Sequence, residues 1–374
     1  MLAIGGLLTA LLVWWLGRRD SARPVSGALT ERERLPHGLT NPPVASTTEG
    51  RAEAGKETLA MAMGCLRAAS GPGAARAVLQ DLRRQLGALP ATEAVGVIQG
   101  FLDTKQDAPT GLGFMVRGDG KLAEAPSLRV FLLDLLAQID PAAAAAYAGK
   151  VLGTMDSADE WAVALRNAAV VATTTEARVF LKEKMASLLG YDPWRREAST
   201  GYLEAFDVAV FLGETNLMPP LVGLLRQKES PALAHAAYLA LDRMVTAEPT
   251  TVLGALAAAP EWMQGREETR ANYFARADVR DAGQRRVVEQ YLLNLEISAA
   301  ELQKFAGLYP NANYMVSPNL LTRVRTPTQA ELAARDRQAL TVVNEWLQDA
   351  RFAGRHRELE AMRRRLEGFV GDGR

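Results

Sequence analysis

The chain has 374 residues, of which 48% are hydrophobic, so it is long enough to bury an extended core. Lysine plus arginine equals aspartate plus glutamate, 43 of each, whereas proteins whose main task is to grip nucleic acid usually carry a basic excess. The single cysteine, Cys65, excludes an internal disulfide and a cysteine-cluster metal site. Alternating Val/Ile/Thr patterns with hairpin turns are almost absent, which predicts no substantial sheet.

The chain starts with an uncharged apolar run over residues 2–16. This run is shorter than the ~20 residues that a spanning helix prefers. However, Trp14 and Trp15, followed by Arg18 and Arg19, resemble the aromatic and basic belt of a membrane interface. We therefore predict a transmembrane or signal-anchor helix over residues 1–17, with a cleaved signal peptide as the alternative.

The residues after this anchor predict its orientation and a tether. Basic residues flank the cytoplasmic end of a span, which favours a body on the cytoplasmic side of the inner membrane. If the sequence lacked an upstream basic segment, the inference would reverse and the body would be periplasmic. Residues 18–50 hold four prolines and no apolar periodicity, so they are predicted to be a disordered linker.

From Arg51 onward, apolar residues recur at steps of three and four, as in amphipathic helices. Residues 218–244 show the pattern best, as two helices with a polar break at Lys228–Ser230. Ser230 is expected to be the N-cap of the second helix, with Pro231 at its first position. Helices are predicted over residues 51–69, 74–88, 91–104, 127–139, 141–155, 157–172, 176–189, 196–212, 216–227, 231–246, 248–259, 266–277, 281–295, 298–308, 328–350 and 354–370.

Two irregular stretches interrupt these helices. The glycine-rich stretch 106–126 is expected to be a flexible loop between helices. The second stretch, 308–320, is rich in tyrosine, asparagine and proline, a composition that suits a presented recognition loop. An ordered loop packed on its own helices is the alternative. The candidate contacts with a partner are Tyr309, Asn311, Asn313 and Tyr314.

The spacing of the helices indicates an array. Alternate predicted helices start at 141, 176, 216 and 248, a loose period that is typical of stacked helical hairpins. Leu233, Ala236–Ala237 and Ala240–Leu241 resemble the second helix of a HEAT repeat. The resemblance is clearest over residues 141–259. It implies an α-solenoid of the armadillo, HEAT or TPR type, a right-handed stack of antiparallel helical hairpins.

The predicted fold is therefore all-α, with a HEAT-like repeat domain over 51–260 and a C-terminal helical extension or cap over 261–374. The last helix carries a candidate basic surface. A solvated charged face is expected there, and contact with anionic lipid or an acidic partner is the alternative. The arginines of this surface are Arg355, Arg357, Arg363, Arg364 and Arg365.

No cofactor or metal is expected, because His37, His235 and His356 lie far apart in the sequence and no nucleophile motif is present. The favoured function is a membrane-tethered, non-catalytic scaffold for protein–protein interaction, since solenoids present extended surfaces. One alternative is a cell-envelope enzyme on a helical superhelix, for example one acting on glycan. Another is a DNA-binding HEAT protein, which the charge balance disfavours.

Overall fold

The computed structural model describes residues 47–313 and 315–371, all within one unit, Ala45–Arg374. Helices make up most of these residues, so the all-α prediction is confirmed. The predicted anchor, with Trp14, Trp15, Arg18 and Arg19, lies outside the described residues, as does most of the predicted linker. In the described part of the chain, no helix combines the length and the apolar composition needed to cross a bilayer.

The elements follow in chain order. The first group is α2 (Thr48–Arg67), α3 (Pro72–Gly87), α4 (Ala91–Asp103), β1 (Met115–Val116), β2 (Leu122–Glu124), α5 (Leu128–Ile139), α6 (Pro141–Val151), α7 (Ala158–Val170) and α8 (Thr175–Gly190). The second is α9 (Asp192–Arg196), α10 (Thr200–Glu204), α11 (Phe206–Leu212), η1 (Thr215–Leu217), α12 (Met218–Leu225), α13 (Pro231–Ala247), α14 (Pro249–Ala258) and η2 (Pro260–Met263). The third is α15 (Glu267–Phe274), α16 (Ala282–Leu293), α17 (Ala299–Leu308), α18 (Gln329–Gln348), η3 (Ala350–Arg355) and α19 (His356–Gly371).

Short polar side chains start many of these helices. Ser127 accepts a hydrogen bond from the backbone N–H of Val130 at the start of α5. Thr328 and Glu331 form a reciprocal capping box at the start of α18. Thr47 caps α2, so this helix begins three residues before the predicted Arg51. Ser230 stands at the N-cap position of α13, but its side chain makes no capping hydrogen bond there.

The predicted helix 196–212 is wrong in one respect, because the chain breaks there into α9, α10 and α11. Ser199 ends the break by capping α10, accepting from the N–H of Tyr202. Its hydroxyl donates to Asp159 at 2.6 Å, and the N–H of Gly201 donates to the same oxygen at 3.0 Å. This tertiary contact with α7 starts a new helix where the apolar period alone predicts continuity.

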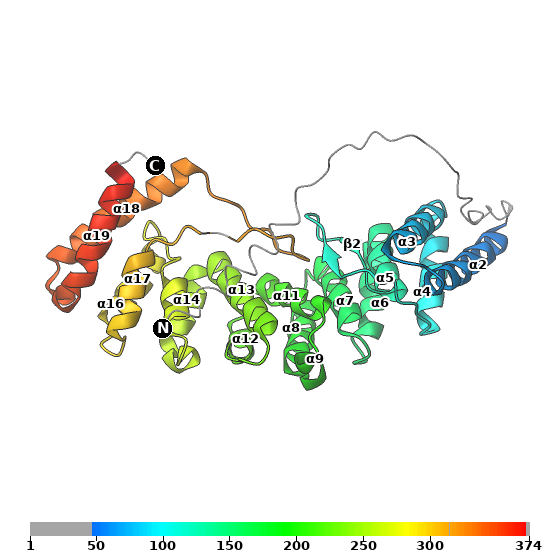
Figure 1. Ribbon diagram of the computed structural model, residues 1–374, viewed down its shortest axis with the longest axis horizontal. Helices are drawn as coiled ribbons and strands as arrows, with labels where there is room; N and C mark the ends of the chain where they lie inside the picture. Colours follow the sequence, from blue (N-terminus) through cyan, green and yellow to red (C-terminus); the bar gives the residue numbers. More distant parts are fainter. Residues whose placement is uncertain (1–46, 314, 372–374) are drawn as a thin grey trace. The chain divides into compact units, whose positions relative to one another are not determined.

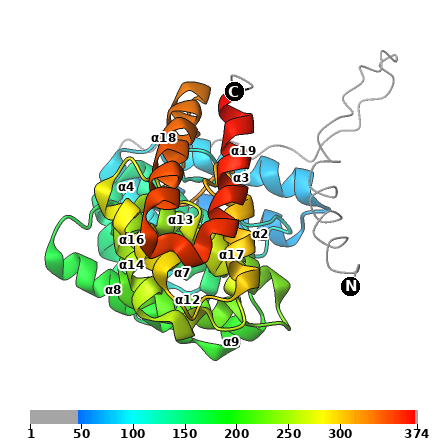
Figure 2. The same ribbon diagram turned by 90° about the vertical axis from the view of Figure 1, so that its left-hand side faces the viewer.

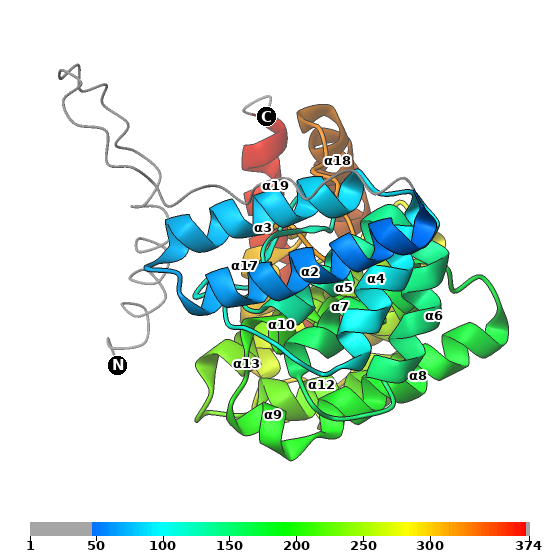
Figure 3. The same cartoon turned by 90° about the vertical axis from the view of Figure 1, so that its right-hand side faces the viewer.

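The described helices pack mainly against their near neighbours in the chain (Figure 1). The closest contacts include α2 with α3, α6 with α7, α12 with α13, α15 with α17, and α18 with α19. Figure 3 shows α2 beside α3 and α4 near one end of the series, and Figure 2 shows α18 beside α19 at the other. Buried side chains occur along the whole series of helices. The largest include Trp161, Tyr202, Tyr273 and Trp346.

The stretch 106–126 is more ordered than the sequence indicates. It forms the antiparallel hairpin β1–β2, and Phe114 before the hairpin and Leu122 within β2 are buried. The carboxylate of Asp134 accepts from the N–H of Leu122 at 3.2 Å and from Nη1 of Arg166 at 2.6 Å. The same arginine donates to the carbonyl oxygen of Gly120 at 3.0 Å, so buried charges on α5 and α7 hold the hairpin in place.

Candidate functional site

The connection between α17 and α18, which we call the long loop (residues 309–327), lies on helices far from it in sequence. In Figure 1 this orange segment runs from the end of α17 toward α11 and β2 before it returns to α18. Near its start, the N–H of Asn311 donates to the carbonyl oxygen of Ala275 at 2.7 Å. Further on, Arg243 of α13 donates to the hydroxyl of Ser317 at 2.6 Å.

The far end of this loop, residues 317–323, is the loop tip, and α11 holds it through one buried carboxylate. Asp207 is 2% exposed and accepts from the N–H groups of Leu321 at 2.7 Å and Thr322 at 2.9 Å. The hydroxyl of Thr322 donates to the second carboxylate oxygen. Hydrogen bonds to a charged group are stronger than neutral ones, so Asp207 is the main polar anchor of the tip.

The hairpin turn meets the loop tip at Gly120. This residue has φ +82°, a left-handed conformation that glycine adopts without strain. A Cβ atom at this position would collide with the backbone carbonyl of Leu320. Leu320 itself is 2% exposed, so the tip is wedged between the hairpin and the helices. The close approach explains why a glycine stands at this turn.

We expect Gly120→Ala to loosen the loop tip and to lower the free energy of unfolding by about 1–3 kcal/mol, because it adds both backbone strain and a collision with a carbonyl. Limited proteolysis should then cut the long loop faster than in the unchanged chain. Gly118→Ala is the matched control, since a Cβ there meets nothing within 4 Å. Equal cleavage of the two variants would show that Gly120 does not support the loop.

Beside this anchor lies a carboxyl group with an altered proton affinity. Burial raises the pKa of Glu204, in α10, to about 6; the negative charge of Asp207 acts in the same direction, and Arg243 opposes it. Arg243 is also the residue that donates to Ser317 of the long loop. Glu204 therefore changes charge in a mildly acidic range, next to the two side chains that hold the loop.

The raised pKa predicts a pH dependence of stability. From about pH 4.5 to about pH 6, the folded chain keeps the Glu204 proton and the unfolded chain loses it, so the free energy of unfolding falls. The loss is at most about 2 kcal/mol and is complete above that range. Urea unfolding of the unchanged chain and of Glu204→Gln measures it, because glutamine removes the titration. A difference between the two that stays constant over this pH range would contradict the assignment.

The candidate partner contacts are not presented together. Tyr309 is fully buried, with its ring 5.1 Å from Phe305, and Asn311 is 5% exposed and donates to Asn272 at 2.5 Å. The expectation that these two side chains reach a partner is thus corrected, because core packing and hydrogen bonds within the fold use them. Asn313 is exposed, and Tyr314 lies outside the described residues. Met315 and Val316, which the sequence argument passed over, are 46% and 60% exposed.

The predicted basic surface is also divided. Arg355 donates to the carbonyl oxygens of Leu292 and Asn294, both at 2.8 Å. It thus supplies hydrogen-bond donors to carbonyl groups at the C-terminal end of α16. Arg365 donates to the carbonyl oxygen of Tyr309, and burial lowers its pKa. Three arginines complete the set: Arg363 pairs with Glu360 and Glu367, while Arg357 and Arg364 are exposed. The five arginines therefore do not form one available surface, because Arg355 and Arg365 donate to backbone carbonyls outside α19, and Arg364 donates to the carbonyl oxygen of Glu360.

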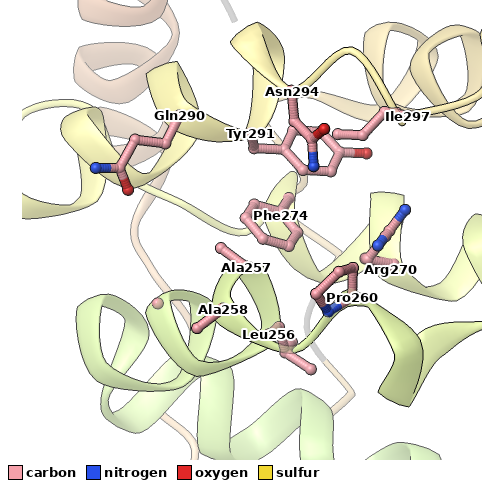
Figure 4. A pocket seen from close by; sticks show the side chains of 11 residues that line it. Leu256, Ala257, Ala258, Pro260, Arg270, Phe274, Gln290, Tyr291, Asn294 and Ile297 are labelled. Carbon is pink, nitrogen blue, oxygen red and sulfur yellow. The ribbon is translucent and has the colours of Figure 1, made fainter.

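A separate pocket of about 250 Å³ lies between α14, α15 and α16 (Figure 4). Phe274 and Tyr291 stack there with ring centres 4.1 Å apart. Arg270 binds both carboxylate oxygens of Glu301 at 2.7 Å, and the hydroxyl of Tyr291 donates to the same carboxylate at 2.9 Å. Because these buried groups satisfy one another, the ion pair beside the pocket serves the packing of α15 on α17.

The residues that hold the long loop are ones that the sequence argument missed. Asp207 interrupts the apolar run Phe206–Val210, as Asp134 interrupts the run Phe131–Leu136. A single carboxylate among apolar residues is costly to bury without partners, so it signals a buried hydrogen-bond acceptor. That signal identifies the carboxylates, but the sequence does not indicate which distant segment donates to them.

Comparison of the chain with protein-family models, with curated proteins and with solved structures found no match.

Proposed function

We propose that this chain is a membrane-tethered α-solenoid of HEAT-like helical hairpins, and that it acts as a scaffold for protein–protein interaction. The packing of each helix mainly on its near neighbours in the chain supports the solenoid. The HEAT-like pattern in α13 supports the choice of repeat, because Leu233, Ala237, Ala240 and Leu241 all lie on its buried stripe.

The single observation that carries the scaffold function is the course of the long loop. Residues of α11 and α13, the residue that follows α15, and the hairpin turn together hold an irregular segment more than a hundred residues away from Asp207 in sequence. A surface that binds such a segment within one chain has the hydrogen-bonding groups needed to bind one from another protein. We call this surface the loop face: Gly120, Asp207, Arg243 and Ala275, with the long loop that lies on it.

The tether is the second part of the proposal. Residues 1–17, with Trp14 and Trp15 before Arg18 and Arg19, anchor the chain in the membrane. The positive flank after the anchor favours a helical unit on the cytoplasmic side, with a periplasmic unit as the alternative. Deleting residues 1–17 is expected to release the chain from membranes, whereas the full chain resists extraction by high salt and carbonate. A deletion variant that stays on membranes at high salt would contradict the anchor.

The scaffold function is tested by capturing partners of the full chain, extracted from its own membranes in mild detergent. We expect a reproducible set of co-purified proteins, and a loss of about tenfold or more in their recovery for Val316→Asp, which places a charge on the exposed leg of the long loop. Val170→Asp is the matched control, because Val170 in α7 is the same residue type with the same 60% exposure. If no specific partner co-purifies with the chain, the scaffold function is wrong. If Val316→Asp and Val170→Asp reduce partner recovery equally, the loop face is not the surface that binds the partner.

A further inference from the structure

The loop tip sits in its site in the way that a bound peptide does. Its main partners come from separate parts of the chain: Gly120 of the hairpin turn, Asp207 of α11 and Arg243 of α13. Leu320 is the buried apolar side chain of the tip, at 2% exposure, and Asn319 beside it is 1% exposed. The site therefore combines an apolar contact with a carboxylate that accepts from two consecutive backbone N–H groups.

The hydrogen bonds define which segment the site accepts. The carboxylate of Asp207 accepts from the backbone of Leu321 and Thr322, which any residue except proline provides, and also from the hydroxyl of Thr322. The hydroxyl restricts that position to threonine or serine. The apolar contact requires an aliphatic residue two positions earlier, where Leu320 stands. The backbone of the segment must also pass close to Gly120 of the hairpin turn, as the carbonyl group of Leu320 does.

The contacts within the tip also matter, because they shape it before it binds. Nη1 of Arg323 donates to the carbonyl oxygens of Asn319 and Thr322, both at 2.8 Å. The hydroxyl of Ser317 donates to Asn319 at 3.3 Å. A segment that is already turned in this way loses less conformational entropy on binding than a free coil does.

We propose that this site is a receptor for a turn-forming segment of a partner protein, in which an aliphatic residue stands two positions before a threonine or serine, and that the loop tip is its built-in occupant. The proposal rests on the scaffold function and names the class of segment that the scaffold binds. The partner segment takes the place of residues 319–322: its aliphatic side chain replaces Leu320, and its hydroxyl donates to Asp207.

Tethering of the tip explains how such a site is kept closed. A tethered segment acts at an effective concentration in the millimolar range, so it outcompetes a free segment of the same affinity. Only molecules whose site is open can bind a partner, so the apparent affinity falls as the fraction of molecules with an occupied site rises. Weakening the tip is therefore expected to strengthen binding of a segment added in solution, whereas weakening Asp207 lowers it. A receptor therefore predicts opposite changes in peptide binding for the two substitutions, whereas a merely structural contact does not.

The test uses a fluorescent peptide with the sequence of residues 317–325 and the full chain in detergent. Leu320→Asp expels the chain's own tip by placing a charge in an apolar site beside Asp207. We expect the peptide to bind this variant at least about tenfold more tightly than the unchanged chain. A peptide with valine in place of threonine at position 322 should lose this binding, as should the chain that carries both Leu320→Asp and Asp207→Asn.

A second variant covers the case in which Leu320→Asp does not fold. Thr322→Ala removes only the hydroxyl that donates to Asp207, so the tip is weakened and the apolar contact is retained. Peptide binding that is no tighter in either folded variant than in the unchanged chain would overturn the receptor. That result would leave the scaffold function intact if partners still co-purify with the full chain. Conversely, tight peptide binding without co-purified partners would support the receptor while contradicting the scaffold.

Discussion

Replacing Arg270 by methionine is expected to lower the free energy of unfolding by about 3–5 kcal/mol, one of the two largest effects that we predict. Arg270 is 9% exposed and binds both oxygens of Glu301, which is 1% exposed. Without the guanidinium, the carboxylate keeps the hydroxyl of Tyr291 as a donor but has no compensating charge. Urea unfolding followed by far-UV circular dichroism at neutral pH measures the difference.

The matched control for this variant is Arg363→Met, in α19. Arg363 pairs with Glu360 and Glu367, but its side chain is 33% exposed, and its partners are more exposed still. An ion pair in contact with water contributes little, so the control should cost under about 1 kcal/mol. Similar losses in the two variants would mean that the Arg270–Glu301 pair is not buried as described. Adding Glu301→Gln to Arg270→Met removes the uncompensated carboxylate, so a double variant that is more stable than Arg270→Met would identify this charge as the cause.

The second large effect is expected for Leu241→Ala, with a loss of about 2–5 kcal/mol. Leu241 lies on the buried stripe of α13 and is fully buried. Alanine leaves a cavity among neighbours from the packed helices α11, α12 and α14, which contact α13. Thermal and urea unfolding of the purified chain measure the loss, and the spread of the expected range reflects how far the neighbours can close the cavity.

Lys228→Ala is the control for this substitution. Lys228 lies between α12 and α13 and is exposed, so its replacement should change the free energy of unfolding by less than about 0.5 kcal/mol. A comparable cost at both positions would place the buried stripe of α13 on the wrong face. A small cost at both would show that this hairpin contributes little to the cooperative unfolding of the unit.

The positions of most helices follow from local properties of the sequence. Leu233, Ala237, Ala240 and Leu241 recur at steps of three and four, and the structure places each of them on the buried side of α13. Pro141 and Pro249 stand at the beginnings of helices, where a missing N–H costs nothing. Prediction failed where a contact between distant residues intervened, as at Ser199, whose hydroxyl bonds to Asp159 and begins a new helix.

The candidate site was harder to predict because its parts are separated in sequence. The sequence identifies residues 308–320 as a stretch without helical periodicity, and its composition suggested an exposed contact at Tyr309. In the structure Tyr309 is buried, whereas the tip of the same loop bonds to Asp207. Tyrosine suits both an exposed recognition surface and a core, since it joins a large apolar ring to one hydroxyl. Composition cannot distinguish these two environments.

By itself, the sequence determined the all-α class, the approximate bounds of most helices and the apolar stripe of α13, because these depend on interactions between residues three and four positions apart. The tertiary structure alone decided which surface receives the loop tip. The bonds between Asp207 and Thr322 join residues more than a hundred positions apart, and the fit of Leu320 over Gly120 depends on the distance between two backbones. Such pairings have no sequence period, since they arise only when separate helices have packed.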